Sequence, residues 1–152
     1  MHEWRNSFLC YYVYFCAMMT NCLWVPEGKA LEVANYYCAI FKHSQIKSQN
    51  AWTCHFELNG QAFLALQGGD QFKPNEAVSF VVTCEDQTEI DHYWQALTAD
   101  GGQEQACGWL KDKYGFSWQI IPNNLNQLLQ SPQAMQALMG MKKIIIEQLK
   151  QA

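Results

Sequence analysis

Hydrophobic and polar residues alternate between residues 51 and 58, which is the pattern of a half-buried β-strand. The hydrophobic positions of this stretch are Trp52, Cys54, Phe56 and Leu58. Asn59 and Gly60 follow, and this pair favours a tight turn with positive backbone φ angles. Residues 61–67 then run back along the first strand, so the pattern predicts a β-hairpin over 51–67.

Two other stretches predict helices, because their apolar residues recur at helical spacing. The first covers 29–41, and its expected buried positions are Leu31, Ala34, Cys38 and Phe41. The second follows Asp86, a favourable N-cap residue, and Glu89 completes a capping-box-like pattern. Its expected buried positions are Ile90, Tyr93, Trp94 and Leu97. Short strands are predicted at 21–25, near Gln45 and at 78–84.

A second hairpin is predicted near the end of the chain, with a tryptophan on each arm. Trp109 leads into the turn-forming residues 112–115, and residues 117–121 then alternate as a strand does. The order strand, helix, strand, hairpin therefore occurs twice, which favours two similar βαβββ modules. The parity of the strands places Phe80, Trp118 and Ile120 toward the helices, and Ser79, Ser117, Gln119 and Ile121 on the opposite, concave face.

The C-terminal tail is predicted to be helical. Leu125, Leu128 and Leu129 indicate a short helix, and Ser131 followed by Pro132 is typical of an N-cap and first helical position. Further apolar positions are Met135, Leu138, Met139, Ile144, Ile145 and Leu149. Packing of the tail onto its own domain is the preferred interpretation, and a dimer contact is the alternative.

The composition bounds the class of protein. A chain of 152 residues with 49% hydrophobic and 14% aromatic residues is about one domain with a buried core. A formal net charge of −4 leaves no basic surplus for nucleic acid. Seven cysteines without a C-x-x-C pair indicate neither a disulfide framework nor a zinc site, so a cytoplasmic location is expected.

The first nineteen residues stand apart from this picture. Residues 8–19 form an apolar run that is too short to span a bilayer as a helix, and no membrane partner is expected. Three interpretations remain, in order of preference. The segment is an overlong start with the true initiator at Met18 or Met19, an extra strand or arm, or a weak signal peptide.

Three segments resemble a known family. They are FLALQGG from Phe63 to Gly69, FKPNEAVSF from Phe72 to Phe80, and QACGWLKDKYGFSWQIIP from Gln105 to Pro122. They resemble the PhnB-like branch of the glyoxalase/bleomycin-resistance superfamily, also called vicinal oxygen chelate, which often carries the label 3-demethylubiquinone-9 3-methyltransferase. The resemblance implies an α+β fold of paired βαβββ modules that form a cupped mixed sheet with a helical C-terminal tail, and it implies a homodimer. We expect this domain at 20–152, after an N-terminal extension at 1–19.

The resemblance also implies where a metal ion would bind. Members of the superfamily take one ligand from the first and last strand of each module, and these positions fall at or next to Cys22 and at Ala65, Ala77 and Gln119. Alanine has no donor atom, so no metal is expected, which weakens an assignment as a glyoxalase, a dioxygenase or a fosfomycin-type transferase. The methyltransferase label is also disfavoured, because no G-x-G-x-x-G follows a strand.

The expected ligand-binding residues are Trp24, His55, Gln67, Ser79, Cys107, Trp109 and Gln119. His55 is the preferred histidine, although one face of its strand or the other could be the pocket. Cys107 lies near Lys111 and could be a nucleophile, but a small residue that enters a strand is the preferred interpretation. No catalytic residue and no cofactor is assigned. Polar points inside an aromatic cup would suit a flat, apolar small molecule.

These observations predict a cytoplasmic protein that binds a small molecule, with enzyme activity left open. One alternative is a metal-assisted enzyme with unusual ligands such as His55 and Glu57. Another is a dimeric interaction protein whose own aromatic residues fill the cup.

Overall fold

The computed structural model describes residues 19–152. The three interpretations of the N-terminal extension concern residues that, apart from Met19, lie outside this range. Within the described range, no helix has the length and apolar character needed to cross a membrane.

The first module consists of one helix and four strands. These are β1 (Asn21–Val25), α1 (Ala30–Ile40), β2 (Gln45–Gln49), β3 (Thr53–Leu58) and β4 (Gln61–Gln67). The sheet order is β1-β4-β3-β2, in which β1 runs parallel to β4 and the other pairs are antiparallel. The predicted hairpin is confirmed, and its turn residues Asn59 and Gly60 have φ angles of 46° and 81°. Trp52 was expected inside the strand, but it precedes β3 and is 68% exposed.

The second module repeats this topology. Its elements are β5 (Ser79–Cys84), α2 (Gln87–Thr98), a 3-10 turn (Ala99–Gly101), β6 (Gln103–Glu104), β7 (Trp109–Lys111) and β8 (Ser117–Pro122). The sheet order is β5-β8-β7-β6, and β5 runs parallel to β8. The capping prediction for α2 is confirmed, because the Asp86 carboxylate accepts a hydrogen bond from the Glu89 backbone N–H at 2.9 Å. The predicted duplication of the element order is therefore confirmed.

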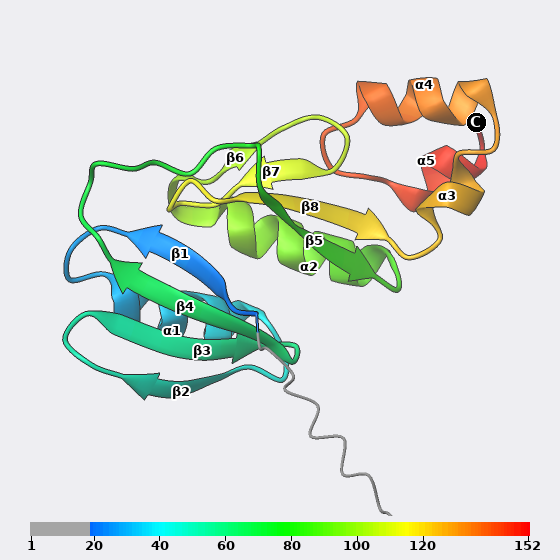
Figure 1. Cartoon of the computed structure of the whole chain (residues 1–152). Coiled ribbons are helices and arrows are strands. Elements are labelled where there is room, and N and C mark those ends of the chain that lie inside the picture. Colours follow the sequence, from blue (N-terminus) through cyan, green and yellow to red (C-terminus); the bar gives the residue numbers. More distant parts are fainter. Residues whose placement is uncertain (1–18) are drawn as a thin grey trace, which may run out of the picture.

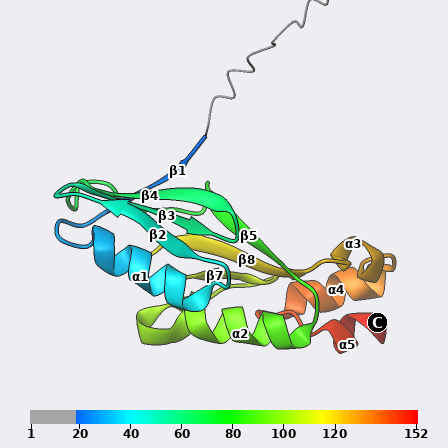
Figure 2. The same ribbon diagram turned by 90° about the horizontal axis from the view of Figure 1, so that it is seen from below.

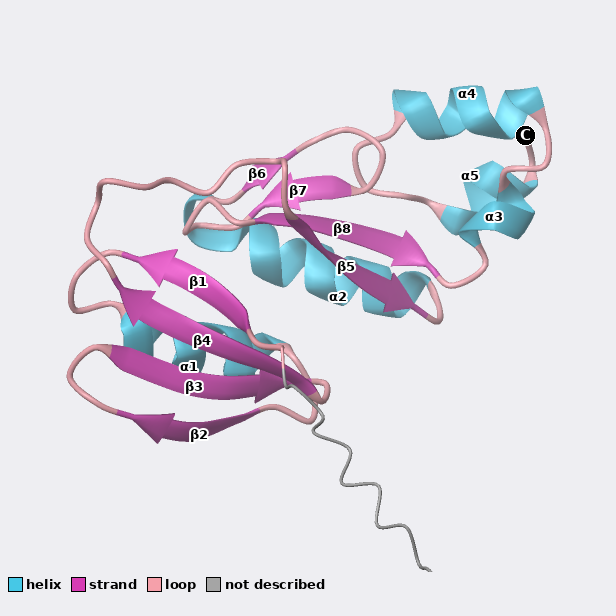
Figure 3. Ribbon diagram, in the orientation of Figure 1, coloured by secondary structure: helices cyan, strands magenta, loops and turns pink. Residues whose placement is uncertain are grey.

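The two sheets and the two long helices form two layers. In Figure 1, α1 lies behind the first sheet and α2 lies behind the second. The view from below in Figure 2 shows both helices on the same side of the strands, and Figure 3 separates helices from strands by colour. The opposite face of each sheet carries no helix of its module. Strands β1 and β5 are the inner edges that face the neighbouring module.

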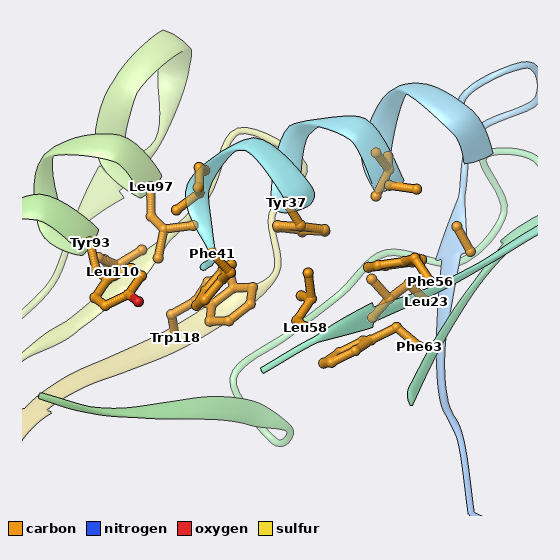
Figure 4. Packing of buried hydrophobic residues seen from close by; sticks show 14 of the residues in the cluster. Leu23, Tyr37, Phe41, Phe56, Leu58, Phe63, Tyr93, Leu97, Leu110 and Trp118 are labelled. Carbon is orange, nitrogen blue, oxygen red and sulfur yellow. The ribbon is translucent and has the colours of Figure 1, made fainter. Parts of the chain in front are cut away.

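One hydrophobic core joins the modules (Figure 4). The ring of Phe41 stacks on Tyr93 with centroids 5.0 Å apart and on Trp118 with centroids 5.3 Å apart. The buried face of α1 differs from the predicted one, because Leu31 is 41% exposed and Tyr37 is fully buried. Helix α1 therefore buries a different face from the predicted one, and Tyr37 on this face contacts the second module.

A buried carboxylate accepts a hydrogen bond from this tyrosine. Asp112, in the turn between β7 and β8, is 3% exposed. Its Oδ2 accepts hydrogen bonds from the Tyr37 hydroxyl at 2.6 Å and from Trp118 Nε1 at 2.7 Å. Its Oδ1 accepts from the backbone N–H groups of Tyr114 at 2.9 Å and Phe116 at 3.1 Å. This carboxylate therefore shapes the hairpin turn and ties it to α1.

The tail forms three short helices, α3 (Leu125–Leu128), α4 (Pro132–Gly140) and α5 (Ile146–Lys150). The predicted cap of α4 is confirmed, since Ser131 Oγ accepts from the Ala134 N–H at 2.9 Å. The tail packs on its own domain, as preferred, and Ile144 in it is fully buried. Two expected apolar contacts are wrong, because Met135 and Met139 are 45% and 69% exposed on the outer face of α4.

Candidate ligand-binding site

The gap between the inner edges of the two modules contains a cavity. This cavity, called here the β5 groove, has a volume of about 610 Å³ and runs along residues 79–83 of β5. Its opposite wall comes from the first module, where Asn21, Asn59 and Gln61 contribute amide side chains. Lys42, His43, Glu85 and Glu89 stand at its rim. The size lies within the range of roughly 300–1,000 Å³ that is common for ligand pockets.

Aromatic rings form the floor of the β5 groove. Phe63 and Phe80 meet edge to face with centroids 5.3 Å apart, and Phe80 and Trp118 lie 5.0 Å apart. Phe41 and Tyr93 extend this floor toward the ends of α1 and α2. Such a floor offers flat apolar contact area, and the surrounding amides and hydroxyls can orient a ligand.

Ser79 and Gln119 lie on the face of their strands opposite Phe80 and Trp118, and of the two only Ser79 lines the β5 groove. Gln119 Nε2 donates a hydrogen bond to Ser79 Oγ at 2.9 Å, and Ser79 lines the β5 groove. The predicted face of Trp118 and Ile120 is confirmed, because both are buried against the helices, with 2% and 0% exposure. Ser117 departs from its predicted open position, since it is 1% exposed and its hydroxyl has no partner among the described residues.

Trp24 lies at a separate cavity of about 290 Å³. Its Nε1 donates to the Gly69 carbonyl at 2.9 Å, and its ring meets Phe72 edge to face at 4.9 Å. Cys22 also lines this cavity, and burial raises the pKa of its thiol. The thiol of Cys22 is therefore held in its protonated, weakly nucleophilic form.

The other expected ligand-binding residues lie outside both cavities. Gln67 joins two loops, because its Oε1 accepts from the Gly28 N–H at 2.5 Å and its Nε2 donates to the Ala51 carbonyl at 3.2 Å. Cys107 has a φ angle of 60° and bonds through its backbone N–H to the Met141 carbonyl of the tail at 2.8 Å. Trp109 is half-buried on β7, directly opposite Gln119.

Burial shows which face of β3 His55 occupies. Cys54 and Phe56 are 1% exposed against the helix, so His55 occupies the open face and is exposed. Glu57 lies on the same face and pairs with Lys47 at 2.5 Å. Among residues 19–152, no group of three or more His, Cys, Asp or Glu side chains is placed to hold a metal ion.

The positions inferred for metal ligands need a correction. Ala65 is fully buried opposite Leu23, so it faces the helix, and Ala77 lies in the turn before β5. A shift of one residue along a strand moves a side chain to the other face. The open-face residue next to Ala65 is Leu64, which carries no donor atom, and the first open-face residue of β5 is Ser79, whose hydroxyl is bonded to Gln119.

Sequence reasoning did not identify the opposite wall of the groove. Asn59 and Gln61 were interpreted only as parts of a hairpin, and Phe63 carried no functional signal. Their role depends on how the modules sit side by side, which no local pattern encodes. The unusual density of aromatic residues was the one available sign of a cup.

Comparison with known proteins gives a consistent picture. The sequence model described as 3-demethylubiquinone-9 3-methyltransferase matches residues 17–121. The chain is 32% identical to a solved PhnB protein from Bacillus cereus that carries the same 3-demethylubiquinone-9 3-methyltransferase label, with a TM-score of 0.63 over 68% of this chain and 98% of that one. No curated protein matches the sequence.

Two more distant structures show the fold alone. A glyoxalase-related enzyme from Fulvimarina pelagi is 17% identical, with a TM-score of 0.50 over 71% of this chain and 90% of that one. The fosfomycin resistance protein FosX from Listeria monocytogenes, solved with Mn(II) and sulfate, is 10% identical, with a TM-score of 0.51 over 69% of this chain and 88% of that one. The predicted α+β fold of the glyoxalase/bleomycin-resistance type is therefore confirmed.

Proposed function

Because the chain belongs to the 3-demethylubiquinone-9 3-methyltransferase family of PhnB-like proteins, we propose that it binds a small organic molecule in the β5 groove without a metal ion. The observation that supports this proposal is the groove itself. It combines a volume of about 610 Å³ with a floor of aromatic rings and the hydroxyl of Ser79, which Gln119 holds by a hydrogen bond from outside the groove. A few fixed polar groups around an apolar floor are the usual composition of a ligand pocket.

Metal-assisted chemistry has less support. His55 and Glu57 could supply two donors, but Glu57 is already paired with Lys47, and no third acidic, histidine or cysteine side chain joins them in the described range. A metal centre in this fold would need at least three protein ligands. We therefore propose a function that does not use a divalent ion.

The name of the family is not evidence that this chain transfers methyl groups. Common methyltransferases that use S-adenosylmethionine bind it at a glycine-rich turn of a doubly wound parallel sheet. The two sheets here have the orders β1-β4-β3-β2 and β5-β8-β7-β6, and only one pair of strands in each is parallel. We propose ligand binding and no methyl transfer.

A fluorescence titration with 8-anilinonaphthalene-1-sulfonate, a flat aromatic probe, tests the proposal. Thr83 lines the groove at its exposed rim, so Thr83→Trp should fill the groove and weaken probe binding about tenfold or more. Thr88 is exposed on α2 outside both cavities, and Thr88→Trp is the matched control. Gln119 donates to Ser79, which lines the groove, so Gln119→Ala should weaken binding about fivefold by releasing that hydroxyl. Equal binding by both tryptophan variants would contradict the proposal.

We further propose that the protein is a cytoplasmic homodimer. Phe72 and Val78 are 61% and 70% exposed on the linker between the modules and line the same cavity, so they form an exposed apolar patch of the kind that marks an interface. The five cysteines of the described range are free thiols, as expected in a reducing compartment. Sedimentation equilibrium should give twice the chain mass for the natural protein, and Phe72→Ser should lower it. A monomer at all accessible concentrations would exclude the dimer.

A further inference from the structure

The two outer edges of the sheets are protected against pairing with another strand. Strand β2 carries Lys47, and its register with β3 shifts between Ile46 and Ser48. Strand β6 is only two residues long. Charged residues, irregular register and short length are the means by which natural proteins keep sheet edges from pairing.

The inner edge strand β5 has none of these protections. Residues 79–84 contain no charged residue and no proline, and Val81 is 53% exposed. Within the described chain, β5 pairs with β8 alone. Alternate residues of such an edge strand direct their backbone N–H and C=O groups away from the sheet. Because all five residues 79–83 line the β5 groove, these backbone groups lie along one of its walls.

The remaining walls complement an extended chain. Asn59 and Gln61 are exposed on the opposite wall, and each side-chain amide can both donate and accept a hydrogen bond. Between the two walls, Phe80 is half-buried and rests on the buried rings of Phe63 and Trp118, so it can contact an apolar side chain of an added strand. Lys42 lies 3.8 Å from Glu89 at the rim, and Glu85 leaves one carboxylate in excess there. The groove thus offers paired donors and acceptors and disfavours a ligand with acidic side chains.

We propose that the β5 groove binds a short peptide without acidic side chains in extended conformation, which adds to β5 as a further strand. This proposal rests on the ligand-binding function proposed above and specifies the chemical class of the ligand. Backbone hydrogen bonds to β5 would supply affinity, and alternate apolar side chains on the aromatic floor would supply specificity. The five groove residues of β5 extend over roughly 17 Å, so the fitting peptide has about four or five residues.

The probe is the capped pentapeptide acetyl-TVTVT-amide, titrated into the isotope-labelled full chain and followed by NMR. We expect shifts and slowed hydrogen exchange at the backbone amides of residues 79–83. The same peptide methylated at every backbone nitrogen has no N–H donors, and it should bind about 30-fold more weakly, as expected for the loss of two ordinary hydrogen bonds.

Paired variants locate the binding edge. Val81→Lys places a charge beside the β5 edge at an exposed position, and it should weaken peptide binding about tenfold with an unchanged melting temperature. Val78 is also exposed but lies outside the β5 groove, so Val78→Lys should bind as the natural chain does.

Three results would overturn the peptide assignment. If the anilinonaphthalene probe binds and the pentapeptide does not, the groove takes small molecules of another class and only this inference fails. Equal binding of the methylated and unmethylated peptides would show that backbone pairing is not used. Protection of the 79–83 amides that grows with protein concentration, without peptide, would mean that a second copy of the chain covers the edge.

Discussion

Replacement of Asp112 should reveal how strongly the two modules depend on one buried carboxylate. Asp112→Ala would leave four donors without their acceptor, namely the Tyr37 hydroxyl, the Trp118 indole and two backbone N–H groups of the turn. Each unsatisfied buried donor costs about 1–3 kcal/mol, and removal of one partner from a buried charged network costs about 3–5 kcal/mol. We expect a loss of about 3–5 kcal/mol in the free energy of unfolding.

A matched pair of tyrosine variants isolates burial as the cause. Tyr37 and Tyr114 each donate a hydroxyl hydrogen bond to a carboxylate, at 2.6 Å to Asp112 and at 3.0 Å to Glu32. The first pair is buried and the second is exposed to solvent. Tyr37→Phe should cost about 1.5–3 kcal/mol, the usual value for a hydrogen bond to a buried charged group. Tyr114→Phe should change stability little, because water replaces the lost partner.

The pH dependence of these variants tests the electrostatic part of the reasoning. Burial raises the pKa of Asp112 above its ordinary value of 3.8, although hydrogen bonds from Tyr37 and Trp118 act to lower it. A carboxyl group with a raised folded-state pKa contributes stability that is present below the unfolded pKa and is lost as pH rises through the folded pKa. The cost of Asp112→Asn should therefore be larger near pH 4 than at pH 7.

Urea denaturation followed by tryptophan fluorescence measures each of these free energies. Two results would refute the reasoning. Equal costs for Tyr37→Phe and Tyr114→Phe would show that burial of the acceptor has no special weight. A cost of Asp112→Asn that grows from pH 4 to pH 7 would show that the four donors outweigh desolvation, so that the pKa of Asp112 is lowered in the folded protein.

Three other substitutions give simpler tests, each measured by chemical or thermal denaturation. Trp118→Ala should cost about 3–5 kcal/mol, because a large buried side chain is replaced by a small one, and a cost below 1 kcal/mol would mean that the aromatic floor is not packed as described. Gly68→Ala should destabilise the protein and alter the fluorescence of Trp24, since a Cβ at residue 68 would lie 2.0 Å from the indole. Gly140→Ala is the control, because a Cβ there would have no atom within 4 Å, and this variant should be neutral or slightly stabilising. Ser131→Ala should cost about 1 kcal/mol through loss of the α4 cap, and an unchanged midpoint would contradict the capping geometry.

Local signals predicted most of the fold because they act over a few residues. The turn at Asn59 and Gly60 needs positive φ angles, and the cap at Asp86 needs only an acceptor close to a free N–H. The face that α1 buries could not be predicted in this way. Tyr37 has a polar hydroxyl and becomes fully buried only because Asp112, 75 residues later in the chain, accepts its hydrogen bond. Helical periodicity alone cannot detect such a partner.

For the candidate site, too, local patterns predicted some features, and those that depend on tertiary contacts were missed. Strand parity was enough to bring Ser79 and Gln119 together on one face, since they belong to neighbouring parallel strands. Parity also placed Ser117 on the open face, but the chain covers that end of β8 and buries the residue. The anchoring role of Gln67 between two loops depends on tertiary contacts and left no pattern in the sequence.

Duplication of the module explains why the groove lies where it does. In each module the first strand pairs in parallel with the last strand and so becomes an edge of its own sheet. When two such modules lie side by side, as in Figure 1, the uncharged first strands β1 and β5 become the inner edges. The groove then takes one wall from β5 and the other from the β3–β4 turn of the first module, which carries Asn59 and Gln61. The site is thus a property of the pair of modules, and each module alone would leave its inner edge open to solvent.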